Sequence, residues 1–391
     1  MQITAAQTTN RIRRVAVVGG GPAGATAAAE LAKRGVSVVL YHVDPGHGEK
    51  PCGGGVTLRA LDQFPYLYDL GLRGNPISKI QLCSPRGRRV VIESAEAMFQ
   101  IYSRGELDQS LRKRAQSFGA EICNEPASDV FESGGNVNIT INNRTESFDA
   151  VVGADGVFSR VRRRFAGMLP KENLCPAVDE LVSGIDPAEG VHLAFYKNIT
   201  GYLWVFPRVD LASVGMVARE GELRGDEMRA RARSYISNNL SKKYPNGKIV
   251  RSVGWAIPAP CASGEPATAV AGKKYILVGD ASGLADPLTG EGIYYAILSG
   301  TVAAECLAAG TPELYHQALR EKLQNELVRA SHFANHYFRA HYIETVLFAA
   351  KWSPRVRRVL RDLLSGRQKY SQLDSRIRAE LGWVGWILRR F

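Results

Sequence analysis

Residues 15–24, read as VAVVGGGPAG, decide the fold of this chain. A run of β-branched and small apolar residues leads into a glycine-rich turn, and an alanine-rich segment over residues 22–33 follows. A buried strand, a turn and a helix in this order form the dinucleotide-binding unit, in which Gly19, Gly21 and Gly24 take the fixed positions of the G-x-G-x-x-G pattern. The first glycine permits the tight turn, the second lets the backbone approach a diphosphate, and the third lets the helix pack closely on the strand.

The helix that begins at Pro22 and Ala23 presents free N–H groups and the positive end of its dipole to the diphosphate. The second strand, over residues 36–41, usually ends in an acid that binds the ribose hydroxyls, about 20 residues after the first glycine. Here Tyr41 takes that place, and Asp44 follows three residues later. We expect Asp44 to reach the adenosine ribose if the strand ends early, and otherwise the phenol of Tyr41 to make a single weaker bond. This unit alone does not distinguish NAD from FAD.

Two later segments select FAD. The runs VVGADG at residues 151–156 and ILVGD at residues 276–280 each lead from an apolar strand into a glycine and an acid. Gly279 and Asp280 place a carboxylate where it can bond a polyol chain, which the ribityl group of a flavin supplies and NAD lacks. The turn through Pro287 and the run Gly290-Glu291-Gly292 then open a helix whose N–H groups face the flavin N1/C2=O edge, where a reduced flavin carries negative charge. The three segments together predict bound FAD.

The order of the elements predicts an α/β protein with a discontinuous Rossmann-like FAD-binding domain. Residues 166–269 change to short alternating segments, such as 191–196, which are typical of antiparallel strands. The chain is mostly helical from residue 312, with breaks near Ser353-Pro354 and Gly382. We assign residues 1–80, 100–165 and 270–310 to the FAD-binding domain, residues 81–99 and 166–269 to an inserted antiparallel β-sheet that binds the substrate, and residues 311–391 to a C-terminal helical region.

The composition fits a cytoplasmic protein without a disulfide framework. The six cysteines are scattered, with no CxxC pair and no metal-ligand spacing, so we expect reduced thiols and no metal site. The first 14 residues carry no apolar stretch of signal-peptide type. No run approaches the roughly 20 apolar residues that a membrane-spanning helix needs.

The formal net charge of +12 is concentrated near the C-terminus, where residues 351–391 hold eleven Lys or Arg and three acids. One interpretation is a solvated helical face. The other is a peripheral contact with a membrane surface, because Trp352, Trp383 and Trp386 lie among the basic residues, as in amphipathic helices at the headgroup level. Nucleic acid is not expected as a partner, since no recognised nucleic-acid motif accompanies the charge.

The three cofactor segments resemble the p-hydroxybenzoate hydroxylase-like flavoprotein superfamily, which includes aromatic hydroxylases, halogenases and geranylgeranyl reductases. In that superfamily the segment that matches Asp155 and Gly156 braces the cofactor cleft. An arginine that opens the preceding helix, matching Arg104, reaches toward the flavin. The resemblance implies that these residues surround FAD, and a plain surface cation is the alternative for Arg104.

Further motifs point to one branch of this superfamily. The runs KPCGGG at residues 50–55, YLWVFP at residues 202–207 and TGEGI at residues 289–293 resemble the geranylgeranyl reductase family. Its members carry a Pro-Cys-Gly-Gly loop over the flavin and a YxWxFP strand in the substrate wall. The resemblance implies that the loop comprises Cys52, Gly53 and Gly54, and that the wall comprises Tyr202, Trp204, Phe206 and Pro207.

The physical chemistry of both motifs suits this resemblance. The period-two alternation of a strand places Tyr202, Trp204 and Phe206 on one face, which gives either an apolar wall for a long prenyl chain or a filled core between the domains. Consecutive glycines after Cys52 let the backbone come close to the isoalloxazine. The Cys52 thiol is then either a group that donates a proton or positions the alkene, or a small buried hydrophobe.

The resemblance implies a reductase that saturates isolated C=C bonds of a geranylgeranyl-type chain by hydride transfer from reduced FAD. Cys52 or an ordered water then protonates the second carbon. The partner is a hydrophobic isoprenoid-bearing small molecule. The external reductant is NAD(P)H or a ferredoxin, because the sequence has no second G-x-G-x-x-G to decide between them.

Two other functions stay open at this point. A FAD-dependent monooxygenase or halogenase acting on an aromatic substrate is one, because the WxWxIP strand of halogenases resembles residues 202–207. A halogenase also needs a lysine between flavin and substrate, and Lys79 is the position that we would test. An electron-transfer flavoprotein dehydrogenase is the other, although such proteins more often carry cysteine clusters for iron–sulfur ligation.

Overall fold

The computed structural model describes residues 12–43, 50, 52–259 and 270–390, with the backbone alone for residues 324, 325 and 381–390. Its centre is a parallel sheet in the strand order β18-β12-β1-β2-β8. The strands are β1 (Arg14–Val18), β2 (Ser37–Tyr41), β8 (Glu121–Cys123), β12 (Ala150–Gly153) and β18 (Tyr275–Leu277). These short apolar runs are covered on both faces, as is usual for parallel strands.

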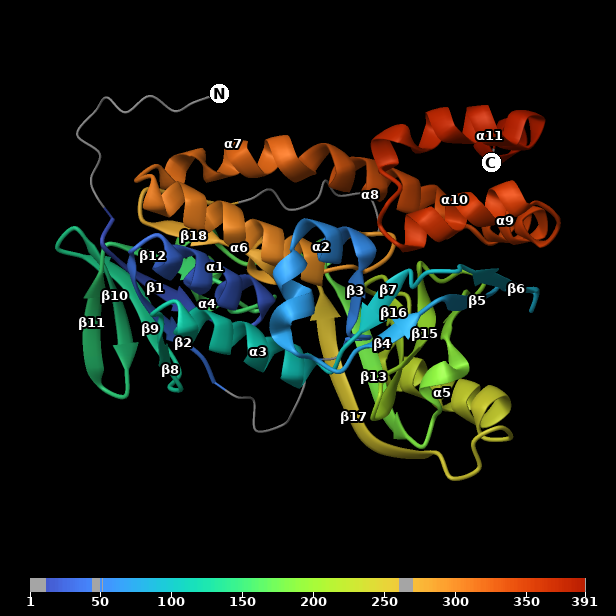
Figure 1. Cartoon of the computed structure of the whole chain (residues 1–391), viewed down its shortest axis with the longest axis horizontal. Helices are drawn as coiled ribbons and strands as arrows, with labels where there is room; N and C mark the ends of the chain where they lie inside the picture. Colours follow the sequence, from blue (N-terminus) through green and yellow to red (C-terminus); the bar gives the residue numbers. More distant parts are fainter. Residues whose placement is uncertain (1–11, 44–49, 51, 260–269, 391) are drawn as a thin grey trace.

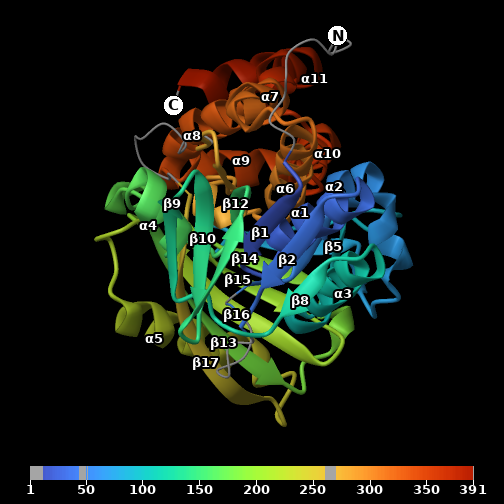
Figure 2. The same cartoon turned by 90° about the vertical axis from the view of Figure 1, so that its left-hand side faces the viewer.

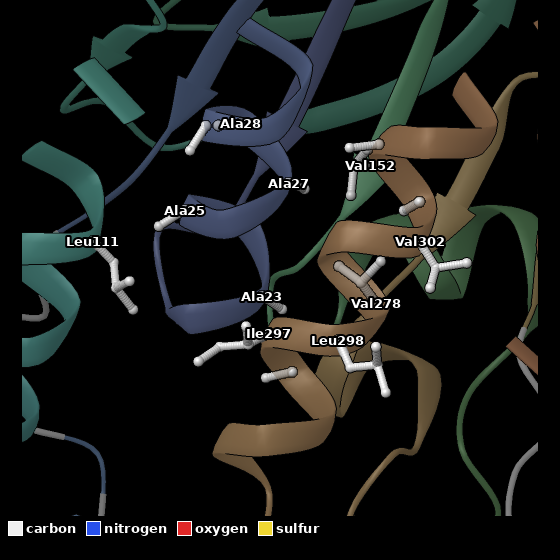
Figure 3. Close-up of a cluster of buried hydrophobic side chains, with 14 of the residues drawn as sticks. Ala23, Ala25, Ala27, Ala28, Leu111, Val152, Val278, Ile297, Leu298 and Val302 are labelled. Carbon is white, nitrogen blue, oxygen red and sulfur yellow. The ribbon is translucent and has the colours of Figure 1, made fainter. Parts of the chain in front are cut away.

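Three helices cover one face of this sheet. They are α1 (Pro22–Lys33), α3 (Arg104–Ser117) and α6 (Ile293–Ala308). Figure 3 shows α1 between the other two, with Leu111 of α3 on one side and Ile297 and Leu298 of α6 on the other. The alanines of α1 at positions 25 and 27 are fully buried, and their small side chains let the neighbouring helices approach closely.

A small antiparallel sheet covers the opposite face. It consists of β9 (Asp129–Ser133), β10 (Asn136–Ile141) and β11 (Arg144–Phe148), and lies beside the parallel strands in Figures 1 and 2. Its apolar side packs on Ala16, Val39 and Val151, which alternate with the residues that face the helices. Helix α4 (Arg160–Ala166) follows β12 and packs near this layer.

The second large sheet has seven strands in the order β17-β13-β16-β15-β14-β5-β6 (Figure 1). The strands are β5 (Lys79–Cys83), β6 (Arg89–Glu93), β13 (Cys175–Ser183), β14 (Val191–Ala194), β15 (Gly201–Pro207), β16 (Leu211–Ala218) and β17 (Lys248–Ile257). The pairings are antiparallel except for the one between β14 and β5. Helix α5 (Gly225–Tyr235) covers one face, where Leu203 and Val205 are fully buried.

A three-stranded sheet joins the two large ones through β3 (Gly55–Thr57), β7 (Phe99–Ile101) and β4 (Asn75–Ile77). Helix α2 (Leu58–Gln63) follows β3 directly. The predicted fold class is confirmed: a parallel α/β unit carries an inserted antiparallel sheet and a helical C-terminal region. The limits of the domains stay a prediction, and β5 begins at Lys79, slightly before the predicted start of the insertion.

The C-terminal region forms α7 (Tyr315–Leu319), α8 (Asn325–Tyr337), α9 (Ala340–Trp352), α10 (Pro354–Leu364) and α11 (Tyr370–Arg390). The break predicted at Ser353-Pro354 is confirmed, since Ser353 caps α10 and Pro354 opens it. The break predicted at Gly382 is wrong, because α11 continues through it. A glycine inside a helix costs only about 1 kcal/mol relative to alanine, which a long helix tolerates. Within the described ranges, no helix combines the length and the apolar character of a membrane span.

Candidate functional site

One cavity of about 650 Å³ brings the three predicted cofactor segments together. Its lining includes Gly19, Gly21, Pro22 and Ala23 from the first segment, Asp155 and Gly156 from the second, and Asp280, Gly290, Glu291 and Gly292 from the third. Gly24, Gly279 and Pro287 are not lining residues. The cavity therefore lies at the carboxyl ends of β1, β12 and β18, where open α/β sheets bind their ligands.

The glycine-rich turn has the geometry that a diphosphate site requires. A Cβ on Gly19 would lie 2.2 Å from the Ala154 carbonyl oxygen, and one on Gly24 would lie 1.9 Å from the Gly19 carbonyl oxygen. A Cβ on Gly21 would meet no atom within 4 Å, because this residue faces open space in front of α1. The first and third glycines thus serve packing, and the second leaves the N-terminus of the helix accessible to an anion.

Tyr41, one candidate for the ribose, is among the residues that line the cavity. Its ring packs against Phe148, with the ring centroids 6.1 Å apart, on the sheet face that carries β9–β11. The alternation of strand β2 directs the phenol toward that layer, and a bond from it to a ribose stays a prediction. The Tyr41 carbonyl oxygen instead accepts a hydrogen bond from the Gly19 N–H at 2.9 Å. Asp44, the other candidate for the ribose, lies outside the described residues.

Asp155 stabilises the turn after β12. Its carboxylate accepts hydrogen bonds from the Ser159 hydroxyl and from the Arg160 N–H, the latter at 2.6 Å. Burial raises the pKa of this carboxyl, and these donors oppose the shift. The side chain therefore holds the start of α4, while Gly156, with a φ of +78°, lets the backbone turn along the cavity.

Two acids of the third segment have basic partners. Asp280 forms an ion pair with Lys50, which the sequence analysis had quoted without a role. Glu291 accepts hydrogen bonds from Thr57 Oγ1 and from Arg59, both at 2.6 Å. Burial raises the pKa of Glu291, and the Arg59 guanidinium opposes that shift. These pairs balance the charge around the N-terminus of α6.

Arg104 is buried in the cavity wall at the start of α3, with 7% of its surface exposed, so the alternative of a plain surface cation is wrong. Its guanidinium forms a two-pronged ion pair with Asp108, at 3.2 and 2.9 Å. Burial lowers the pKa of Arg104, but Asp108 and the neighbouring Cys52 outweigh that effect and raise it. The cation thus stands next to the Cys52 side chain.

The loop at Cys52 is seated on the aromatic strand. Cys52 is half-buried and lines the cavity, and its Sγ accepts a hydrogen bond from the Gly54 N–H at 3.3 Å. A Cβ on Gly53 would lie 2.8 Å from the Phe206 ring, and Gly54 has a φ of +75° with its backbone against the Tyr102 carbonyl oxygen. Larger residues would therefore lift this loop off the wall.

Strand β15 supplies the predicted aromatic wall. Tyr202, Trp204 and Phe206 all line the cavity, whereas Leu203 and Val205 point to α5. Tyr202 and Trp204 stand edge to face with centroids 6.2 Å apart, and the Tyr202 hydroxyl donates to the Thr289 carbonyl in the third cofactor segment.

Pro207 is not part of the lining. It ends the strand, and its carbonyl accepts a hydrogen bond from Asn75 Nδ2 at 2.7 Å.

A buried polar cluster underlies both the loop and the wall. Asp179 of β13 is 1% exposed and Arg208, just after β15, is 2% exposed. Ser213 of β16 donates to Asp179 Oδ1 and accepts from Trp204 Nε1, both at 2.8 Å. Burial raises the pKa of Asp179 to about 6. The sequence did not predict this cluster, because single polar residues in strands form no recognisable pattern.

The C-terminal helices complete the cavity, a role that the sequence also did not predict. Leu360, Leu363 and Leu364 of α10 line it, together with Tyr337 of α8 and Tyr370 at the start of α11. The available signal was the apolar spacing of α10, in which positions 356, 359, 360 and 363 form one buried face. That spacing predicts burial but does not say against what.

Lysine placement bears on the halogenase alternative. Lys79 is exposed at the start of β5 and does not line the cavity. The lysine in the lining is Lys50, and it is paired with Asp280. The position proposed for a halogenase lysine is therefore wrong for this chain.

The comparisons with known proteins agree with this geometry. A sequence model of the FAD binding domain family matches residues 13–324. The chain belongs to this class of flavoproteins: it is a flavin-dependent oxidoreductase, and its cofactor is FAD.

Relatives of known function show which family of flavin-dependent oxidoreductases the chain belongs to. The chain is 30% identical over 339 residues to the chloroplastic geranylgeranyl diphosphate reductase of Arabidopsis thaliana, covering 80% of this chain and 70% of that protein. It is 31% identical over 316 residues to digeranylgeranylglycerophospholipid reductase 1 of Methanococcoides burtonii, covering 75% and 74%. The chain is a member of the geranylgeranyl reductase family.

Solved structures share the fold at lower identity. A geranylgeranyl bacteriochlorophyll reductase-like protein from Thermoplasma acidophilum has a TM-score of 0.75 at 22% identity and covers 94% of this chain and 99% of its own. The flavin-dependent brominase Bmp2 has a TM-score of 0.71 at 19% identity and covers 96% and 97%. Reductases and halogenases therefore share this architecture, so the fold does not choose between them.

The residues present fit FAD. The open N-terminus of α1 at Gly21 suits the diphosphate, and the Asp280 carboxylate in the cavity suits the ribityl hydroxyls. The N-terminus of α6, behind Gly292, suits the N1/C2=O edge of the flavin ring.

Replacing Gly21 with leucine is expected to abolish retention of FAD without unfolding the protein. The new side chain has room, since a Cβ there meets no atom within 4 Å, but it fills the space in front of α1. The measurement is the visible flavin absorbance per protein after purification, with thermal unfolding as the test of folding. Gly225→Leu is the matched control, because that glycine on α5 is equally open. A Gly21→Leu protein with full flavin content contradicts the diphosphate assignment.

The buried Asp179 predicts a pH dependence of stability. Its pKa is raised from 3.8 to about 6 in the fold, so the folded state holds a proton that the unfolded state releases between these values. Relative to Asp179→Asn, the wild-type free energy of unfolding should therefore fall by up to about 3 kcal/mol as pH rises from about 4 to 7. Urea unfolding across this range measures the difference. Glu180→Gln, at the next position of β13, is the control and should retain the decline.

Proposed function

We propose that this chain saturates C=C bonds of a geranylgeranyl-type prenyl chain carried on a small molecule or a lipid. The observation that supports this proposal is the shape of the cavity, which joins the cofactor segments to a wall of aromatic and aliphatic side chains. Tyr202, Trp204 and Phe206 form one side of that wall, and Leu360 and Leu363 belong to another. Such a surface suits a long apolar chain better than a compact polar substrate.

The chain's own residues account for orientation and for exclusion of water. Bound and reduced FAD supplies the hydride, and NAD(P)H or a ferredoxin is the proposed source of its electrons. The aromatic strand holds the prenyl chain across the cavity, and Ile80 and Leu82 of β5 extend the apolar lining. Loss of water from this lining favours reduction of an unactivated double bond over side reactions.

Protonation of the second carbon requires a donor, because an isolated alkene has no carbonyl to take up charge. We assign this step to the Cys52 thiol. It lines the cavity next to the buried Arg104 cation, which stabilises the thiolate that remains after transfer. The double bond thus gains one hydride and one proton. Solvent then reprotonates the Cys52 thiolate between turnovers.

Anaerobic reduction of the flavin, followed by addition of geranylgeranyl diphosphate, tests the proposed function. We expect the oxidised flavin band to return and the product to gain two hydrogens by mass. A geranylgeranylated lipid run in parallel tests which carrier is preferred. Reoxidation only after oxygen is admitted, with an oxygenated or brominated product, would establish the monooxygenase or halogenase alternative instead.

Replacing Cys52 with alanine should leave FAD bound but slow alkene reduction at least about 100-fold, the usual contribution of a positioned proton donor. Single-turnover reoxidation of the reduced flavin by the prenyl substrate measures the effect. Cys123→Ala is the matched control, because that half-buried thiol packs behind the β9–β11 layer. Unchanged rates in the Cys52→Ala enzyme remove the thiol from the reaction.

We also propose that the protein contacts anionic membrane surfaces through the end of α9 and the start of α10. Phe348 and Trp352 are 54% and 71% exposed, and cations stand over both rings, Arg88 at 5.0 Å and Lys351 at 5.4 Å from the ring centroids. Arg355 and Arg358, at the start of α10, are also exposed. Apolar rings among basic residues are the composition of an interfacial anchor. The side chains of Trp383 and Trp386, on which the sequence interpretation also relied, are not described by the structure.

Replacing Phe348 and Trp352 together with serine should weaken binding to vesicles with anionic headgroups about tenfold, the factor that corresponds to a loss of about 1.4 kcal/mol. Point variants are preferable to a truncation, because Leu373 and Ile377 of α11 are buried in the core. Vesicle sedimentation measures the effect. Met168→Ser is the control, since Met168 is 68% exposed on another part of the surface. Equal sedimentation of both variants would reject this contact.

A further inference from the structure

Asp179 and Arg208 are opposite charges buried in the seven-stranded sheet, and Arg208 favours the ionised form of the Asp179 carboxyl. Both are almost completely buried, and Arg208 is the largest of the fully buried side chains. A buried ion pair is seldom the most stable choice, since well-packed apolar residues of the same volume often stabilise a fold more. The presence of this pair beneath the cavity wall therefore calls for a reason other than stability.

The pair holds one peptide segment from two sides. The Arg208 guanidinium donates to the Cys52 carbonyl oxygen at 3.0 Å. The Cys52 backbone N–H favours the ionised form of the Asp179 carboxyl. Because the Cys52 carbonyl has a buried, charged donor and the Cys52 N–H acts on the buried Asp179 carboxyl, the sheet below sets the position of this residue.

The same carboxylate also fixes the aromatic wall. Asp179 accepts from Ser213, and Ser213 accepts from the indole N–H of Trp204. The Trp204 ring passes directly over Gly215, where a Cβ would lie 2.1 Å from a ring atom. One buried group thus connects the residue that would donate the proton with the ring that would hold the alkene.

We propose that Asp179 and Arg208 are positioning residues, which fix the Cys52 thiol relative to Trp204 at the cavity wall. The relevance of this positioning to catalysis rests on the proposed reductase function, whereas the positioning itself does not depend on that function. Neither residue touches the substrate space, since neither lines the cavity, and both act through Cys52 and Trp204.

Protonation of Asp179 should release this arrangement. The charged groups that act on this carboxyl are Arg208, which favours ionisation, and Glu180 of the same strand, which opposes it. Glu180 has its own partner in Arg233 of α5, at 3.1 Å. With Asp179 protonated, Arg208 loses its counter-charge and the Cys52 N–H loses a charged acceptor.

Alkylation of Cys52 by iodoacetamide in the folded, full-length protein tests the proposal without any substrate. Peptide mass spectrometry measures the ratio of the alkylation rates of Cys52 and Cys83 in the same sample, so that effects shared by all thiols cancel. We expect Asp179→Asn to change this ratio about fivefold, the factor that follows from losing one net hydrogen bond. We also expect a step in the wild-type ratio near pH 6, the pKa of Asp179, that is absent in Asp179→Asn.

Arg208→Lys is the second variant, because it keeps the charge but shortens the donor to the Cys52 carbonyl. It should change the ratio in the same direction and remains informative if Asp179→Asn does not fold. Glu180→Gln is the matched control: it should leave the ratio unchanged and retain the step, moved to lower pH because Glu180 no longer opposes ionisation of Asp179. A wild-type ratio without a step, together with unchanged ratios in both variants, overturns the proposal. An equal change in Glu180→Gln overturns it as well. The reductase assay can fail while this result stands, so the two hypotheses are tested separately.

Discussion

The close approach of helix α1 to its neighbours is the constraint on which the rest of the structure depends. A Cβ on Gly300 would lie 2.4 Å from the Ala23 carbonyl oxygen, and one on Gly279 would lie 2.9 Å from the Ala23 Cβ. Ala23 is thus enclosed by the end of β18 and by α6. Because these contacts leave no room for larger residues, the first and third cofactor segments meet at one cavity although more than 250 residues separate them in sequence.

Several charges in the cavity wall are paired. Asp280 pairs with Lys50, Glu291 with Arg59, and Arg104 with Asp108. The first two pairs join Lys50 and Arg59 to the third cofactor segment, whereas Arg104 and Asp108 both belong to α3. Buried charges of this kind favour one arrangement over others, because an unpaired ion in such a place is costly.

The sequence predicted those parts of the site that follow from local geometry. Gly24 is required by a contact within its own turn, with the Gly19 carbonyl oxygen, and the alternation of β15 places Tyr202, Trp204 and Phe206 on one face whatever lies opposite. Gly19 belongs to a common sequence pattern, but the contact that excludes a side chain there is with Ala154 of the second cofactor segment. Tyr41 shows the limit of this reasoning, because the same alternation directs its ring to a layer that only the tertiary structure reveals. Asp179 and Ser213 meet across neighbouring strands, and no spacing within one segment announces such a contact.

The end wall of the cavity comes from a different part of the chain than the cofactor unit. The FAD binding domain match ends at residue 324, whereas the leucines of α10 lie at residues 360–364. The residues that hold the cofactor segments together and the leucines that close this side of the cavity therefore lie in different parts of the chain. Under the proposed function, changing the volume of a few leucines in α10 would alter which length of prenyl chain fits, while the glycines that hold the cofactor segments together stay untouched.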